Sequence, residues 1–115
     1  MPPFDWSIKI EKQPDMPTQV VPNPLDGVRP NDTVSWGDRT GQRHHPWPTK
    51  ENGDLLSQAE VTGANAGNYL SDEMPAGTGS RPVWVAVPST ITGNTIFYCC
   101  KLHPEERGKI VIDND

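Results

Sequence analysis

Apolar and polar residues alternate along several short segments of this chain, as they do in β-strands with one buried face. The alternation is clearest in residues 81–88, where three valines share one side, and in residues 95–100, where it runs into a pair of cysteines. About six to eight short strands joined by turns predict an all-β fold, a Greek-key β-sandwich. The predicted strands are residues 4–12, 19–21, 33–36, 81–88, 95–100 and 110–112.

Residues 46–79 lack this regular pattern and predict one long irregular or partly helical insertion. Residues 54–61 suit either a short helix or a strand, whereas residues 62–68 have the composition of a loop. The chain also contains 13 prolines and 10 glycines, which favours short strands and turns over long helices. Its 115 residues, with neither an internal repeat nor a linker, predict a single domain over residues 1–115.

The charge and hydropathy of the chain exclude some classes of partner. The net charge of −5 argues against a general nucleic-acid binder, because such proteins present a basic patch. No apolar run approaches the roughly 20 residues that a membrane-spanning helix needs. Paired-carboxylate catalysis is not favoured by the spacing of the acidic residues, and the chain has no phosphate-binding loop or zinc-protease helix.

The strongest chemical signal is the clustering of histidine and cysteine at two predicted strand ends. Cys99 and Cys100 close one strand, and His103 follows on a short loop. His44 and His45 lie upstream, shortly after another predicted strand. A thiolate and an imidazole three residues apart can hold one soft or borderline metal ion, and copper fits best among the common candidates.

These residues resemble the motifs of the cupredoxins, the small mononuclear copper proteins such as the plastocyanin-like and amicyanin-like groups. Residues 32–38 read Asp-Thr-Val-Ser-Trp-Gly-Asp, which is similar to the cupredoxin segment that precedes the first copper histidine. The C-terminal stretch matches the pattern Tyr-x-Cys-x-x-His-Pro-x-Met-x-Gly-x-Ile/Val-x-Val. The matching positions are Tyr98, Cys100, His103, Pro104, Gly108, Ile110 and Ile112.

The resemblance implies one copper ion per chain, with His44, Cys100 and His103 as equatorial ligands. Spacing alone leaves His45 open as the first ligand and Cys99 as the thiolate. If His44 is the ligand, the resemblance implies that the backbone N–H of His45 donates to the cysteine sulfur. Because strand alternation directs neighbouring side chains to opposite faces, Cys99 is then expected to be a free thiol away from the metal.

Glu106 stands where the family usually has an axial methionine. A carboxylate is a harder, anionic donor, so as an axial ligand it would stabilise Cu(II), lower the reduction potential and shift the colour from blue toward green or red. The alternative is a solvated Glu106, which is the commoner environment of glutamate. Asp38 replaces a family asparagine and is interpreted either as a turn residue or as added negative charge near the metal.

The resemblance implies an electron carrier rather than an enzyme, working with a redox partner protein as a monomer or weak oligomer. The alternatives are copper storage or delivery, and an open copper site that reacts with a small ligand. The resemblance to the cupredoxins also implies a periplasmic or extracellular location. The sequence begins without a basic and apolar signal segment, which fits either a cytoplasmic protein or a mature form that lacks its signal peptide. Because the resemblance implies export, we expect the mature form.

Overall fold

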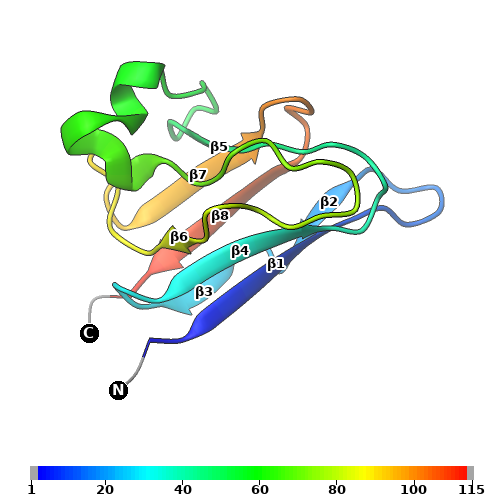
Figure 1. The fold of residues 1–115 in the computed structure, drawn as a ribbon, viewed down its shortest axis with the longest axis horizontal. Helices are drawn as coiled ribbons and strands as arrows, with labels where there is room; N and C mark the ends of the chain where they lie inside the picture. Colours follow the sequence, from blue (N-terminus) through cyan, green and yellow to red (C-terminus); the bar gives the residue numbers. More distant parts are fainter. Residues whose placement is uncertain (1–2, 114–115) are drawn as a thin grey trace.

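The computed structural model describes residues 3–113, which form two four-stranded sheets packed face to face (Figure 1). The first sheet has the order β2-β1-β4-β6, and the second has the order β3-β8-β7-β5. The strands are β1 (Asp5–Glu11), β2 (Gln19–Val21), β3 (Leu25–Val28), β4 (Thr33–Asp38), β5 (Pro46–Thr49), β6 (Trp84–Val85), β7 (Thr95–Cys100) and β8 (Arg107–Ile112). The predicted all-β sandwich is confirmed.

Alternating apolar residues from both sheets fill the space between them. Ile8 and Trp36 from the first sheet and Tyr98 and Ile110 from the second are at most 2% exposed. The rings of Trp36 and Tyr98 meet edge to face with their centroids 5.3 Å apart, so this pair bridges the two sheets. The pairing β1–β4 is parallel, and so is β3–β8.

The strand predicted over residues 81–88 is much shorter in the structure. Only Trp84–Val85 pairs with β4, at the edge of the first sheet. Buried and exposed side chains do alternate along this segment, but the buried side carries Trp84 and Ala86. The valines lie on the other side, with Val83 and Val87 50% and 40% exposed. A proline at each end of the segment limits further pairing, because proline cannot donate to the ladder.

The insertion contains more regular structure than its composition predicts. Residues 46–49 form β5, an edge strand whose two prolines pair with β7. Two 3-10 helices follow, η1 (Gln58–Val61) and η2 (Gly63–Asn68), which appear as the coiled segments in Figure 1. Trp47, Leu56 and Val61 form a second, small apolar cluster beneath them. None of the helices within residues 3–113 has the length and apolar character to cross a membrane.

Gly108 is required by a close approach between β7 and β8. It lies opposite Tyr98, and a Cβ atom at position 108 would be 2.5 Å from the Tyr98 hydroxyl oxygen and 2.7 Å from Val20. We expect Gly108→Ala to lower the free energy of unfolding by about 1–3 kcal/mol, because the overpacked ring must move. Chemical denaturation measures the change. Gly37→Ala is the control, since its nearest neighbour, Lys9, lies 3.9 Å away and no comparable loss is expected.

Candidate metal centre

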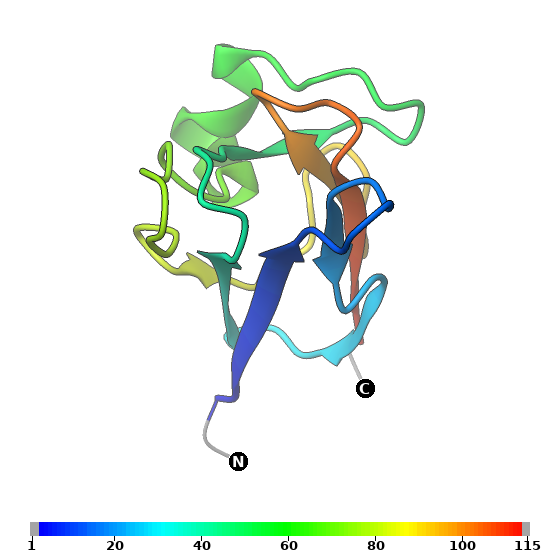
Figure 2. The same ribbon diagram turned by 90° about the vertical axis from the view of Figure 1, so that its right-hand side faces the viewer.

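Four of the predicted site residues converge at one end of the sandwich. His44, Cys100, His103 and Glu106 each offer one donor atom, and these four atoms lie within 4.8 Å of one another. The loop that follows β7 lies at the opposite end of the molecule from the start of β1 (Figures 1 and 2). The cluster thus combines one thiol, two imidazoles and one carboxylate, drawn from two loops far apart in the sequence.

The three-residue spacing of the downstream ligand candidates has a direct structural reason. The N–H of His103 donates to the carbonyl of Cys100 at 3.1 Å, and the N–H of Glu106 donates to the carbonyl of His103 at 2.9 Å. Each bond closes a turn that brings residues three apart close together. The N–H of Cys100 then donates to the carbonyl of Glu106 at 3.0 Å and closes the loop as β8 begins.

His44 is fully buried and held on both sides of its ring. Its Nδ1 lies 3.0 Å from Oε1 of Glu106, and its Nε2 lies 2.9 Å from Oδ1 of Asp38 and 2.8 Å from the hydroxyl of Thr40. Its backbone exchanges two hydrogen bonds with Met74. Because a carboxylate only accepts hydrogen bonds, Asp38 favours a proton on Nε2, whereas Glu106 favours one on Nδ1. A metal ion bound at Nδ1 would take the place of that second proton, while Asp38 keeps the proton on Nε2.

Asp38 has the turn role that the sequence suggested, and it also contacts His44. Its carboxylate accepts hydrogen bonds from the backbone N–H groups of Thr40, Gly41 and Gly77, and it also contacts His44. Burial alone would raise the pKa of Asp38, but hydrogen bonds from the Thr40 side chain and from backbone N–H groups outweigh it and hold the pKa well below its usual range. A fixed negative charge therefore lies next to Nε2 of His44, on the side of the ring away from Glu106.

The spacing of the sequence left His44 or His45 as the first histidine of the cluster, and Cys99 or Cys100 as its thiol. In the structure, His44 and Cys100 lie in the cluster. His45 Nε2 lies 3.0 Å from the carbonyl of Ser71, outside the cluster, while its backbone N–H donates to Cys100 Sγ at 3.3 Å. The predicted N–H contact to the sulfur is therefore confirmed for Cys100. Cys99 is buried elsewhere, and burial raises the pKa of both thiols. For Cys100, the N–H groups of His45, Leu102 and His103 oppose that rise.

The carboxylate of Glu106 points into the cluster and not into solvent. Glu106 is 2% exposed, and its Oε1 lies 3.6 Å from Nδ1 of His103 as well as 3.0 Å from His44. The side chain of His103 is 30% exposed, which makes it the most accessible of the four. Leu102 and Pro104, its neighbours in the sequence, are exposed, so apolar surface lies close to His103. Trp47 does not add to this exposed apolar surface, because it is only 4% exposed and packs in the second apolar cluster.

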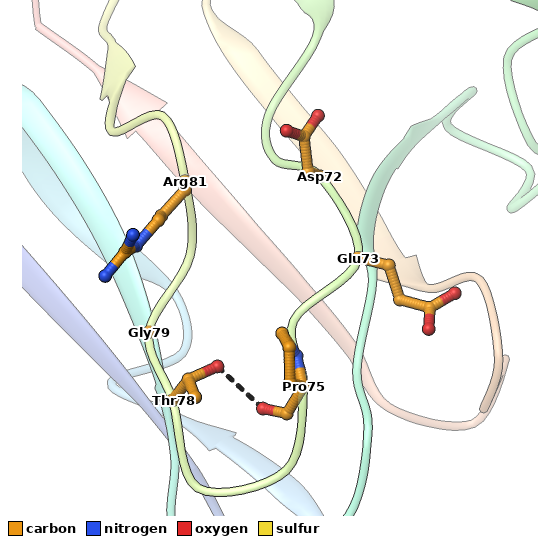
Figure 3. A pocket seen from close by; sticks show the side chains of 6 residues that line it. All are labelled: Asp72, Glu73, Pro75, Thr78, Gly79 and Arg81. Atoms are coloured by element: carbon orange, nitrogen blue, oxygen red, sulfur yellow. Dashed lines mark hydrogen bonds between the residues drawn. The ribbon is translucent and has the colours of Figure 1, made fainter.

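A surface pocket of about 370 Å³ lies on the loop formed by residues 72–81 (Figure 3). It is lined by Asp72, Glu73, Pro75, Thr78, Gly79 and Arg81. The carboxylates of Asp72 and Glu73 point in different directions in Figure 3, and they bond instead to Tyr69 and Arg43. This geometry gives no support to paired-carboxylate chemistry at these two residues.

Two contributors to the site carry little sequence signal. Thr40 contacts His44 Nε2 through its hydroxyl, and Met74 pairs its backbone with His44 from across a long loop. A threonine two residues after an aspartate is a common turn feature, so Thr40 was detectable only as part of a turn. Met74 acts through its backbone, and no residue type marks such a contact.

We expect Asp38→Asn to weaken metal binding by about 10- to 100-fold, because it removes the charge that orients and polarises His44. A competition titration with a chromophoric chelator measures the affinity. Asp32→Asn is the matched control. Asp32 is also buried and accepts hydrogen bonds from Phe4, Arg29 and the Trp6 indole. Equal losses of affinity in both variants would show that general destabilisation, and not the contact to His44, is the cause.

The fold has close counterparts among solved structures. It is similar to a novel purple cupredoxin from Nitrosopumilus maritimus, with a TM-score of 0.67 and 17% identity over 95% of this chain and 100% of that chain. It is also similar to amicyanin from Paracoccus versutus (Thiobacillus versutus), with a TM-score of 0.61 and 15% identity over 98% of this chain and 85% of that chain. No protein-family model matches the chain, and neither does any curated protein sequence. The chain therefore has the cupredoxin fold.

Proposed function

We propose that this protein binds one copper ion through His44, Cys100, His103 and Glu106 and carries single electrons between redox proteins. The observation that carries the proposal is the convergence of these four donors within 4.8 Å at one end of a cupredoxin sandwich. A thiolate with two imidazoles and a fourth donor is the ligand type of blue-copper electron-transfer sites.

The spacing of the donor atoms fits a small metal ion. Bonds of about 2.0–2.3 Å place neighbouring donors of a tetrahedral site about 3.3–3.7 Å apart. The separations are 3.5 Å between Cys100 Sγ and His103 Nδ1, 3.6 Å between His103 and Glu106, and 3.0 Å between His44 and Glu106. Small shifts of the side chains therefore suffice for binding, which supports a site that is largely formed before the metal arrives.

When bound, copper supplies a one-electron redox couple. The chain supplies rigidity, because Asp38 and Met74 hold His44 while two successive turns hold Cys100, His103 and Glu106. Such a site changes little between oxidation states and transfers electrons with little reorganisation. His103, the accessible ligand candidate, is where we place the path to a partner protein.

The acidic surroundings support an atypical copper site. Glu106 and Asp38 add two negative charges to that of the Cys100 thiolate, and this combination favours Cu(II) over Cu(I). We therefore propose a lower potential than that of a site with an axial methionine, and a colour displaced from blue. The structural similarity to a purple cupredoxin supports the second point.

Export and partnership with a redox protein follow from the same proposal, since cupredoxins usually work outside the cytoplasm. Copper delivery is less well supported, because the second thiol, Cys99, is only 1% exposed and cannot easily receive or hand over an ion. An open site that reacts with small ligands requires Glu106 to leave its contact with His44.

The test is a titration of metal-free protein with Cu(II), followed by absorption and EPR spectroscopy. We expect an intense visible band that stops growing at one equivalent, because thiolate-to-copper charge transfer requires a Cu–S bond. Voltammetry should then give one reversible couple that azide and nitrite do not alter. A protein that stays colourless would overturn the proposal, and a spectrum that azide shifts would favour the open site.

A further inference from the structure

A small cavity of about 10 Å³ is lined by residues of both sheets and adjoins the candidate metal centre. It is lined by Ile10, Val20, Trp36, Pro46, Tyr98, Cys100 and Glu106. Two of these residues belong to the proposed metal ligands, and two, Trp36 and Tyr98, form the aromatic pair that bridges the sheets. The volume is close to the minimum that holds one water molecule.

Two buried polar atoms belong to this aromatic pair. The indole Nε1 of Trp36 and the hydroxyl of Tyr98 have no hydrogen-bond partner among residues 3–113, although their residues are 1% and 2% exposed. An unpartnered buried donor costs about 1–3 kcal/mol, so such groups are normally satisfied by protein or ordered water. Burial raises the pKa of Tyr98, and a weak hydrogen-bonding interaction with the Trp36 N–H opposes that rise. The two polar atoms therefore lie near one another, but they do not meet the distance and angle of a hydrogen bond.

The other three tryptophans show that Trp36 is a special case. The indole of Trp6 donates to Asp32, that of Trp47 to the carbonyl of Leu56, and that of Trp84 to the carbonyl of Gly67. Each of these three donor–acceptor distances is 2.8 or 2.9 Å. Among the four indole groups, only that of Trp36 lacks such an acceptor and lines a water-sized cavity.

Glu106 provides the acceptor that completes a water site. Its contacts to His44 and His103 both use Oε1, which leaves Oε2 to accept a further bond. We propose that this cavity binds one water molecule, which accepts from Trp36 Nε1 and from the Tyr98 hydroxyl and donates to the Glu106 carboxylate. Three hydrogen bonds are typical of a buried water. Trp36 and Tyr98 are then positioning residues, because through the water they hold the carboxylate with Oε1 toward the other donors.

The water itself is tested in the metal-free protein by NMR. Of the four indole N–H signals, that of Trp36 should show a cross-peak to a long-lived bound water, whereas that of Trp84, which donates to Gly67, should not. Tyr98→Phe should shift the Trp36 indole signal and weaken or abolish the cross-peak, because one of the three hydrogen bonds is lost. A Trp36 signal with no water contact, or one that Tyr98→Phe leaves unchanged, would overturn the proposal.

The positioning role rests on the proposed copper site and has its own readout. In the copper-loaded protein, Tyr98→Phe should shift the position of the visible band, since the carboxylate is less firmly oriented. Tyr69→Phe is the matched control, because it also removes a phenol hydroxyl, here one bonded to the exposed Asp72. Equal band positions in the Tyr98→Phe and wild-type proteins would overturn the positioning role. The NMR result does not depend on copper, so failure of copper binding and failure of the water site are distinguishable.

Discussion

Cys100→Ser is expected to abolish the intense visible absorption of the copper-loaded protein, whereas Cys99→Ser should retain it. The absorption depends on a copper–thiolate bond, and only Cys100 directs its sulfur into the cluster with His44 and His103. A serine hydroxyl is a poor ligand at neutral pH, so metal affinity should also fall by at least about 100-fold. Absorption spectroscopy at one equivalent of Cu(II) gives the answer for both variants.

The pair of variants is well matched. The two cysteines are neighbours in β7, are 1% and 4% exposed, and have thiol pKa values that burial raises. Their main difference is the face of the sheet to which each side chain points. Loss of the band in Cys99→Ser with retention in Cys100→Ser would reverse the assignment of the thiolate and contradict the geometry described above.

Much of the fold was predictable because the strands that form the core alternate strongly. The segments around Ile8, Trp36 and Tyr98 were all predicted as strands, and these residues meet in the middle of the sandwich. β5 was not predicted, because Pro46 and Pro48 contradict strand propensity. It forms because the edge of the second sheet tolerates residues without an N–H donor.

The candidate site was predictable as a set of residues but not as a geometry. The spacing from Cys100 to His103 to Glu106 is local, and two turns convert it directly into proximity. The choice between His44 and His45 could not be made from spacing, because it depends on the direction of each side chain. That direction is set by Asp38 and by the backbone of Met74, which lies 30 residues beyond His44 in the chain.

The cavity that adjoins the site was not predictable at all. Trp36 and Tyr98 were correctly predicted to lie in strands, but nothing in a sequence states whether a buried indole finds an acceptor. Three of the four indoles do so through side chains or carbonyls that only the folded chain brings near. Such contacts depend on how loops and strands pack in three dimensions, which residue patterns do not encode.

Glu106→Gln is expected to raise the reduction potential of the copper-loaded protein by on the order of 170 mV. The substitution keeps the shape of the side chain but removes its negative charge. Glu106 is only 2% exposed, and its carboxylate lies among the other three donors. Two unit charges about 4 Å apart interact by about 4 kcal/mol at an effective dielectric constant of 20. Because 59 mV corresponds to a tenfold change for one electron, this energy is worth about 170 mV in favour of Cu(I) once the charge is gone.

Glu105→Gln separates this effect from a general change in surface charge. Glu105 is the neighbouring residue, but it is exposed, so water and salt screen its charge. Its removal should change the potential by no more than about 20–40 mV. Voltammetry of both variants and the wild type, in one buffer, gives the comparison. Equal shifts in the two variants would remove Glu106 from the metal's coordination. A large shift in Glu106→Gln alone, together with a band that moves toward blue in Glu106→Met, would establish the carboxylate as the axial ligand, since a thioether is the weak axial donor of ordinary blue sites.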